Sequence, residues 1–574
     1  MRNSRTKRFA ALAFGTCVFA SAAQAAVTIS NAKTKNMTCT GGVCTPTGGN
    51  ANLNVGELQT MLASSDVTVK TGAGAVAIGV DDPLTWASTH RLTLDSVEFV
   101  HIKAAVVVEG TAGLTLTTND GGTGGDLVFE NGGYVNFWDT NSSLIINGAN
   151  YTLVKDLPTL VNGINGTHNN FALANSYDAS ADGTYKRTLI SEIGSQEFLE
   201  GLGNTIGNLT IAVHGSFKKH PKNDAALIGL SAGVVRDIAL TNVSVSYSKA
   251  SFNGFDAAVV ITNYGSIINV NISGVVLSSS GRASGLVDIN YGIIRSSRAD
   301  VQVTGWAAAG LVLDNEQPGI IESSQATGAV RSTGFTFAGG FAGENHGTIT
   351  NSFATGDVYA DQNGGSAGFV GVNTGNIVLC HATGDAHQGL YAGGLVAANV
   401  SPYGMPPFPK IVQSYATGSV SSSTSTAQVG GLIGSNLPGS IEQSYATGSV
   451  TDSSGNASDQ VGGLVGSNAF RSEILQSYST GLISYTSEQS PPGGLIGVDS
   501  KRNNIFADYW DLDTSGISNP RQGAGNIPHD RGITGLSDAQ LKSALPAGFD
   551  PNVWGQSSSI NNGWPYLLAN PPQQ

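Results

Sequence analysis

The sequence predicts an all-β fold, an elongated parallel β-helix (solenoid) with a C-terminal cap. The first observation is a repeat, because two small residues (often both glycine), an apolar pair and a polar turn return ten times at spacings of 25–37 residues. The second is that each copy holds several glycines and only short β-branched runs, which disfavours helices. Coils of this size bury their apolar faces only by stacking on their neighbours. The copies align on the apolar residue after the glycines: Leu227, Val259, Leu286, Leu311, Phe341, Phe369, Leu395, Leu432, Leu464 and Leu495.

The composition excludes several other classes of protein. Of 574 residues, 76 are glycine and 19 proline, yet 40% are hydrophobic, so a disordered or collagen-like chain is excluded. Charged residues make up only 12%, which leaves the surface mostly to Ser, Thr, Asn and Gly and is unusual for a cytosolic enzyme. The net charge of −13 disfavours nucleic-acid binding, because phosphates would be repelled.

The order of elements within one coil is clearest in the copy that begins at Gly430. An apolar strand leads through a turn at 435–439 into a second strand at 441–446, and a Thr-Gly corner opens a third strand at Val450. Three strands with tight corners make one coil of a parallel β-helix. A propeller blade needs four strands and about 40–50 residues, more than these units contain.

The chain divides into four predicted parts. Residues 1–25 are a signal peptide, because basic residues precede an apolar run that ends at a small-residue cleavage site, Ala-Gln-Ala. Residues 26–197 form an irregular N-terminal β-solenoid region, in which short apolar strands alternate with Gly, Asn and Asp turns. Residues 198–510 hold about ten coils. Residues 511–574 are expected to cap the open end of the core, and three of the six tryptophans lie at or after residue 510.

The repeat resembles the GLUG motif of bacterial exported and surface proteins, which include filamentous-haemagglutinin-like adhesins and some immunoglobulin A peptidases. The resemblance rests on Gly-Gly-Leu-Val-Gly-Ser-Asn at 462–468, on Ser-Tyr-Ala-Thr-Gly-Ser-Val at 414–420 and 444–450, and on the segment 198–206. It implies export and a β-helix, and little about chemistry. Residues 26–197 are similar to N-terminal parts of haemagglutinin-like exoproteins. They lack the Asn-Pro-Asn phrases of two-partner secretion domains, so the export route stays open.

The cysteines point to one structural disulfide. Cys39 and Cys44 flank a Gly-Gly turn, and in an exported chain we expect them to be bridged. A zinc site would need about four ligands, and no further Cys or His pair lies nearby in the sequence. Two unpaired thiols are the alternative.

Candidate catalytic groups are sparse. Asp508, Asp511 and Asp513 form the densest acidic cluster, for which a glycosidase pair is the alternative to a turn-forming role. No histidine is followed by glutamate, so the His-Glu-x-x-His motif of zinc peptidases is absent. The glycine–serine pairs recur with the repeat and do not support a serine nucleophile. We therefore expect no catalytic residue, no cofactor and no metal ligand.

For two polar segments the sequence allows either a ligand-binding role or a purely structural one. Residues 121–129 match a single calcium-binding nonapeptide, but such sites form between stacked copies, so a plain turn entering a strand is preferred. Lys218, Lys219, His220 and Lys222 form a basic run, which is either a solvated loop or a contact for an anionic glycan.

The repeat also predicts two columns of stacked side chains. The first is a column of asparagines, each at a strand-to-turn corner with left-handed backbone angles. We interpret it as a ladder of hydrogen-bonded amides in preference to a glycan-binding stripe. Its members are Asn263, Asn290, Asn315, Asn345, Asn373, Asn399, Asn436 and Asn468, with Ser231 before them and Asp499 after. Rings are expected to stack at Phe353, His381, Tyr415, Tyr445, Tyr478 and Tyr509, with Cys380 in the slot that Ser352, Ser414, Ser444 and Ser477 occupy in other coils.

These observations favour an exported, non-catalytic, adhesin-like β-helix protein, secreted or held at the bacterial cell surface. Its expected partners are a glycan, matrix or cell-surface ligand and an outer-membrane export partner, with no nucleic acid and no transmembrane segment. The alternative is a secreted polysaccharide-degrading β-helix enzyme, a lyase or glycosidase, which would need carboxylates converging on the solenoid wall.

Overall fold

The computed structural model describes residues 26–72, 74–120, 122, 124–214, 224–248, 255–402, 404–487, 489–500 and 503–572, without the side chains of residues 255–257. It is almost entirely β, a parallel β-solenoid of about 16 turns, which confirms the predicted fold class. The predicted signal peptide, residues 1–25, and the basic run at 218–222 lie outside the described residues.

The chain forms two compact units, one of residues 26–133 with 145–148 and one of residues 134–144 with 149–572. The first boundary thus falls near residue 133, so residues 149–197 belong to the second unit. The predicted limits at residues 197 and 510 stay predictions. The strand β14 (Ser143–Ile146) is divided between the units.

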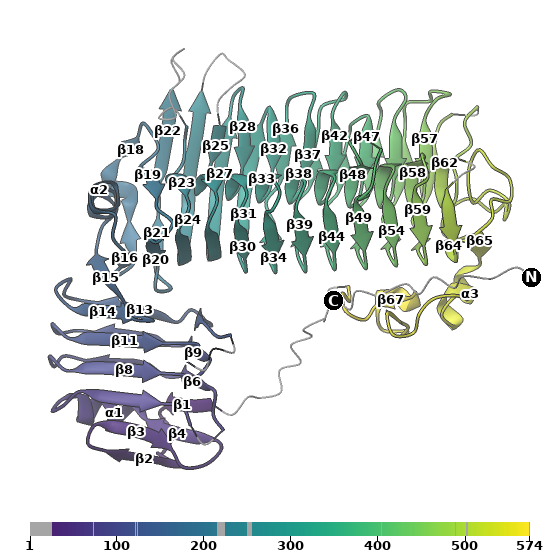
Figure 1. Ribbon diagram of the computed structural model, residues 1–574. Coiled ribbons are helices and arrows are strands. Elements are labelled where there is room, and N and C mark those ends of the chain that lie inside the picture. Colours follow the sequence, from purple (N-terminus) through teal and green to yellow (C-terminus); the bar gives the residue numbers. More distant parts are fainter. Residues whose placement is uncertain are drawn as a thin grey trace, which may run out of the picture. The chain divides into compact units, whose positions relative to one another are not determined.

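The first unit is a small set of parallel coils (Figure 1). Its strands alternate buried and exposed residues, as a half-buried strand requires, and the helix α1 (Val55–Leu62) begins at Asn54, whose side chain accepts from Glu57 N. One parallel sheet holds β12 (Leu127–Phe129), β9 (Phe99–Ile102), β6 (Ala77–Val80), β1 (Ala26–Ser30) and β4 (Ala51–Asn54). The other strands are β2 (Met37–Thr40), β3 (Val43–Pro46), β5 (Val67–Lys70), β7 (Leu84–Trp86), β8 (Arg91–Asp95), β10 (Ala105–Val108) and β11 (Gly113–Thr117).

The strands β2 and β3 form an antiparallel hairpin in which Cys39 lies opposite Cys44. In the structure the two sulfurs are joined by a disulfide. An exported chain would meet an oxidising compartment, so we expect the bridge there as well. Mass spectrometry of a nonreduced tryptic digest should therefore show both cysteines unmodified by alkylating agent. Alkylation of both thiols in native exported material, without reductant, would contradict this.

The second unit is a three-walled solenoid. In most coils one short strand enters each of two walls, and two or three strands enter the third (Figure 1). The eleven-stranded wall comprises β19 (Ile190–Ile193), β23 (Ile228–Ser231), β26 (Val260–Asn263), β29 (Val287–Asn290), β33 (Val312–Asn315), β38 (Ala342–Asn345), β43 (Val370–Asn373), β48 (Val396–Val400), β53 (Ile433–Leu437), β58 (Val465–Asn468) and β62 (Ile496–Asp499). The eight-stranded wall comprises β25 (Phe255–Ala257), β28 (Arg282–Ser284), β32 (Ala307–Ala309), β37 (Phe337–Gly339), β42 (Gly365–Ala367), β47 (Tyr391–Gly393), β52 (Gln428–Gly430) and β57 (Gln460–Gly462).

The third wall contains three parallel rows. The first row is β20 (Phe198–Glu200), β24 (Val234–Ser248), β27 (Ser266–Ser278), β30 (Ile293–Arg295), β34 (Ile320–Glu322), β39 (Thr348–Thr350), β44 (Asn376–Val378), β49 (Lys410–Val412), β54 (Ser440–Glu442), β59 (Glu473–Leu475) and β63 (Asn504–Phe506). The second is β31 (Arg298–Gly305), β35 (Gln325–Ala326), β40 (Phe353–Ala354), β45 (His381–Ala382), β50 (Tyr415–Ala416), β55 (Tyr445–Ala446), β60 (Tyr478–Ser479) and β64 (Asp508–Asp511). The third is β36 (Val330–Ser332), β41 (Val358–Tyr359), β46 (Ala386–His387), β51 (Val420–Ser422), β56 (Val450–Asp452) and β61 (Ile483–Tyr485).

The two ends of this unit are less regular. The first coils contain β13 (Tyr134–Phe137), β15 (Ala149–Val154), α2 (Leu157–Thr167), β16 (Phe171–Leu173), β17 (Tyr177–Asp178), η1 (Ala179–Asp182), β18 (Thr184–Tyr185), β21 (Thr205–Gly207) and β22 (Thr210–His214). The last elements are β65 (Ile533–Leu536), α3 (Asp538–Ser543), β66 (Trp554–Gly555), η3 (Asn561–Gly563) and β67 (Tyr566–Leu567).

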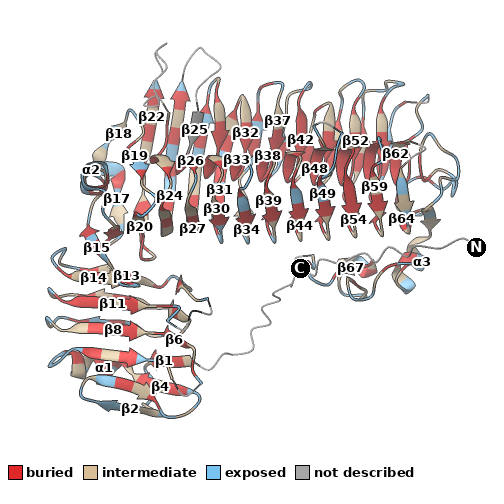
Figure 2. Ribbon diagram, viewed as in Figure 1, coloured by how far each residue is buried: buried red, intermediate tan, exposed pale blue. Residues whose placement is uncertain are grey.

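The core runs through the middle of the coils, where Figure 2 shows buried residues in continuous rows along the walls. The apolar residue on which the copies align is buried in all ten of them, with at most 1% exposed. Burying such a side chain stabilises the fold by about 1.5–3 kcal/mol. Where a copy holds two glycines, the second one lacks a Cβ and so allows neighbouring coils to approach each other closely. A Cβ at Gly340, for example, would lie 2.2 Å from the carbonyl oxygen of Gly368 in the next coil.

The asparagine ladder is present. Each of the eight asparagines is fully buried, and each Nδ2 donates to the Oδ1 of the next member at 2.7–2.9 Å, ending at Asp499. Burial of all eight argues against the alternative of an exposed binding stripe. The prediction of left-handed backbone at these asparagines is wrong. The left-handed column lies at the next corner: Asp237, Asn269, Ser296, Ser323, Asn351, Leu379, Gln413, Gln443, Gln476 and Ala507.

The ring column is present from Phe353 to Tyr478. Successive ring centroids are 4.7–5.1 Å apart and the planes lie within 7° of parallel. Tyr509 keeps the register of Tyr478 but packs edge-on against Phe549. Because the rings stack face to face along the solenoid axis, they have no free faces on which a sugar could stack.

The C-terminal segment has two parts. Residues 511–536 pack Leu512, Ala524 and Ile533 against the core of the last coils, whereas the later residues lie along the coils. Trp510 is fully buried in the central core of the last coils, but Trp554 packs on the outer ring column beside Tyr445 and Tyr478. The chain then runs back along the coils, so that Asn570 bonds to His381 and to Cys380 O. Figure 1 shows α3 and β67 along one side of the stack. We call residues 537–572 the C-terminal strap.

Candidate functional site

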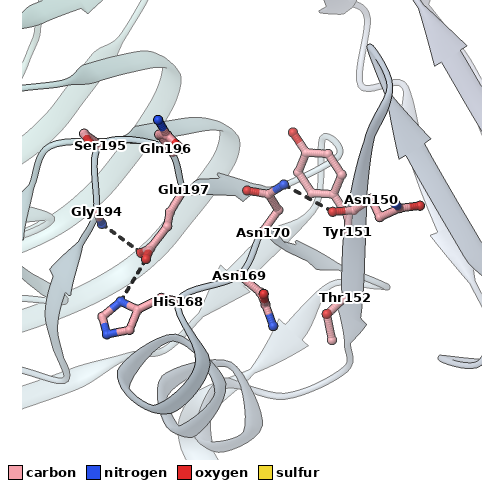
Figure 3. A pocket seen from close by; sticks show the side chains of 10 residues that line it. All are labelled: Asn150, Tyr151, Thr152, His168, Asn169, Asn170, Gly194, Ser195, Gln196 and Glu197. Atoms are coloured by element: carbon pink, nitrogen blue, oxygen red, sulfur yellow. Dashed lines mark hydrogen bonds and ion pairs between the residues drawn. The ribbon is translucent and has the colours of Figure 1, made fainter.

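A polar pocket of about 720 Å³ lies in the first coils of the second unit. Three segments line it, namely 150–152 of β15, 168–170 after α2, and the loop 194–197 between β19 and β20 (Figure 3). Four of the ten lining residues carry side-chain amides, so hydrogen-bonding groups dominate the wall. Such a wall suits a hydroxyl-rich ligand.

One side of the pocket holds a histidine–glutamate pair (Figure 3). The helix α2 ends at His168, whose left-handed backbone (φ 52°) turns the chain. Its Nδ1 lies 2.8 Å from Glu197 Oε1, and Glu197 Oε2 accepts from Gly194 N at 2.8 Å. The Glu197 carboxylate is largely buried and therefore fixed, whereas two-thirds of the His168 side chain is exposed to the pocket.

The opposite side of the pocket is held by Asn170 and Tyr151. Asn170 Nδ2 donates to Asn150 O, and its Oδ1 accepts from Phe198 N, so one amide joins neighbouring coils. The ring of Tyr151 meets Phe198 edge-on, with centroids 6.2 Å apart. Burial, followed by the charge of Glu200, raises the pKa of the Tyr151 hydroxyl, which therefore stays a neutral donor and acceptor.

Buried charges close to Tyr151 are already paired. Arg236 Nε lies 3.3 Å from Glu200 Oε2 and 2.6 Å from Asp237 Oδ2, and all three side chains are largely buried. Glu200 also accepts from Leu202 N. This group is therefore a structural cluster that fixes the coil behind the pocket.

The pocket lacks the pair of carboxylates that glycoside hydrolysis requires. Glycosidases place two carboxyl groups about 5–9.5 Å apart on either side of the sugar bond. Glu197 is the single carboxylate among the lining residues. The arrangement is thus better suited to holding a polar ligand than to cleaving it.

A second pocket, of about 950 Å³, lies between corner loops that follow the asparagine ladder. Its lining is more apolar, with Pro406 and Phe408 from one loop and Phe470 and Arg471 from another. It holds fewer hydrogen-bonding side chains than the first pocket.

The structure separates the sequence-predicted acidic cluster. Asp508 takes the serine slot of its coil and accepts from Ser477 N, and Asp511 accepts from Asp513 N in a turn. Both are fully buried, which fits the turn-forming role rather than the glycosidase pair. In the predicted calcium nonapeptide, Gly121 and Thr123 lie outside the described residues. Among the described residues no group of three or more His, Cys, Asp or Glu could hold a metal ion.

Cys380 lies in the serine column as predicted, with its backbone N–H donating to Ser414 Oγ at 3.1 Å. Its thiol is fully buried, and this burial raises its pKa to about 12. The thiolate is the reactive form of cysteine, so we expect Cys380 to resist iodoacetamide at pH 8 in the folded protein. Denaturant should restore full labelling. Rapid labelling of the native chain, measured by intact mass, would contradict this placement.

The fold defines the chain as a parallel β-helix repeat protein. Its repeats carry the GLUG motif, which the family model matches at residues 338–359 and 425–451. No curated protein matches the chain. A similar solved structure is that of a "putative immunoglobulin A1 protease" from Bacteroides ovatus, with 14% identity and a TM-score of 0.26 over 73% of this chain and 93% of that chain. At these values the similarity carries no information about activity.

Proposed function

We propose that the protein is an exported, non-catalytic β-helix protein of adhesin-like function, secreted or held at the cell surface, that binds a glycan in the pocket at Tyr151, His168 and Glu197. The observation that carries the proposal is the lining of this pocket, in which amides, hydroxyls and a fixed imidazole–carboxylate pair converge. The GLUG motifs support export. No helix among the described residues has the length and apolar character of a membrane span.

Binding to a glycan array tests the proposal. Asn169 and Gln196 line the pocket and are exposed, so Asn169→Ala with Gln196→Ala should weaken binding at least tenfold and leave the fold intact. Asn162→Ala is the matched control, because Asn162 is exposed on α2 outside the pocket. Equal binding by the pocket variant and the control would contradict the proposal.

The enzyme alternative is tested with Glu197→Gln, which keeps the shape and the contact with Gly194 but removes the charge. If the protein is non-catalytic, neither the wild type nor Glu197→Gln releases reducing sugar from polysaccharides. Release by the wild type that disappears in Glu197→Gln would instead establish hydrolysis in this pocket.

A further inference from the structure

The loop between β56 and β57 brings two buried carboxylates together in the second unit. Asp452 ends β56 with 1% of its surface exposed, and Asp459 precedes β57 with 2% exposed. Ser454 contacts both carboxyl groups, through its N–H to Asp452 Oδ1 and through its Oγ to Asp459 Oδ2. Among the described residues no basic side chain forms an ion pair with either of them. Two like charges without solvent or counter-ion are strongly unfavourable.

The two carboxylates are not equally satisfied. Asp459 Oδ1 accepts from Ala427 N of the preceding coil, and its Oδ2 accepts from Asn456 N and from Ser454 Oγ. Asp452 Oδ1 has only a long contact of 3.3 Å with Ser454 N. Its Oδ2 is buried with no hydrogen-bond partner among the described residues. Burial, followed by the charge of Asp459, raises the pKa of the Asp452 carboxyl. A buried oxygen of this kind, with a second carboxylate held nearby through Ser454, lacks a positive partner.

The loop offers further oxygen ligands besides the two carboxylates. The loop reads Asp-Ser-Ser-Gly-Asn-Ala-Ser-Asp from 452 to 459, so oxygen-bearing side chains recur at alternate positions before the final Asp. Gly455 has a left-handed φ of 70°, which folds the loop back over the carboxylates. Hard divalent cations prefer carboxylate, hydroxyl and amide oxygens. Calcium tolerates irregular loops and six to eight ligands, whereas magnesium demands near-ideal octahedral geometry.

We propose that the loop 452–459 binds a calcium ion through the carboxylates of Asp452 and Asp459 and the hydroxyl of Ser454. Water and main-chain oxygens complete the coordination. The ion neutralises both charges and fixes the loop to the neighbouring coils, which Asp459 already contacts through Ala427 N and through Ser490 Oγ. The site is independent of the proposed glycan pocket, so either can fail without the other.

Calcium binding to the full chain, stripped of metal with a chelator, tests the site by calorimetry. We expect a dissociation constant of about 0.1–1 mM, as in extracellular calcium modules. Asp452→Asn and Ser454→Ala should each weaken it at least tenfold. Asp361→Asn is the matched control, because Asp361 lies half-buried in the corresponding loop between β41 and β42 and should leave the constant unchanged. Equal affinity in Asp452→Asn and wild type would overturn the proposal.

Thermal melting distinguishes calcium from a proton shared by the two carboxyls. A ligand that binds only the folded state raises its stability with concentration, so about 10 mM calcium should raise the melting temperature of the wild type and not that of Asp452→Asn. In chelator Asp452→Asn should melt at or above the wild type, because it removes one of two facing charges. A wild type indifferent to calcium, or one that responds equally to magnesium, would overturn the calcium site.

Terbium luminescence locates the ion. Tyr485 lies in register with Asp452 on the adjacent strand β61, and a nearby tyrosine sensitises terbium emission. Terbium bound at the site should emit, and calcium should displace it. This emission should fall in Tyr485→Phe, whereas the calcium affinity should be retained. Unchanged emission in that variant would place the ion elsewhere and overturn the assignment to this loop.

Discussion

Replacing Asn373 with leucine is expected to lower the free energy of unfolding by about 2–6 kcal/mol. The change removes the acceptor of Asn345 Nδ2 and the donor to Asn399 Oδ1, and each buried group left unpaired costs about 1–3 kcal/mol. Guanidinium unfolding followed by circular dichroism measures the loss.

The matched control is Asn376→Leu, three residues further along the same coil. Asn376 is exposed on β44, so its replacement should change the free energy of unfolding by less than about 0.5 kcal/mol. A loss in Asn373→Leu no larger than in the control would mean that the ladder does not stabilise the coils.

Tyr445→Ala is expected to cost about 3–5 kcal/mol of unfolding free energy, the range for removing a buried aromatic ring. The Tyr445 ring is fully buried between Tyr415 and Tyr478 and also contacts Trp554 of the C-terminal strap. The substitution therefore empties a site that joins the ring column to the strap.

Tyr445→Phe should have the opposite sign or no effect. The Tyr445 hydroxyl is buried without a hydrogen-bond partner among the described residues, so its removal should leave stability unchanged or raise it by about 1–3 kcal/mol. Tyr478→Phe should instead destabilise, because the Tyr478 hydroxyl donates to Pro565 O. Equal losses in both Phe variants would show that the two hydroxyls have similar surroundings.

The columns of the second unit could be predicted from the sequence because a solenoid places equivalent residues of successive coils one above another. Isoleucine, asparagine and tyrosine recur at equivalent positions of successive coils, so their side chains stack in columns. The left-handed column could not be predicted, because its members include Leu379 and Ala507 and share no residue type. Their backbone is imposed by the strands on either side rather than by local preference.

The pocket and the strap depend on contacts that the repeat does not encode. His168 and Glu197 lie 29 residues apart in irregular coils, and the segment at 198–206 was the sequence signal nearest to them. Asn570 meets His381 across 189 residues. The first separation is about one coil, but the coils there carry no recognisable copy of the repeat, and the second spans several coils, so only the folded chain brings these side chains together.

The path of the C-terminal strap changes how the solenoid can come apart. A stack of coils with only nearest-neighbour contacts behaves as a one-dimensional array, and its terminal coils fray one at a time. Here the hydroxyls of Tyr509, Tyr478 and Tyr415 donate to the carbonyl oxygens of Ala547, Pro565 and Pro571, which ties one segment to coils spread along the array. Because the last coil cannot open without detaching this segment from the others, fraying at the C-terminal end becomes an all-or-none event over the coils between His381 and Tyr509.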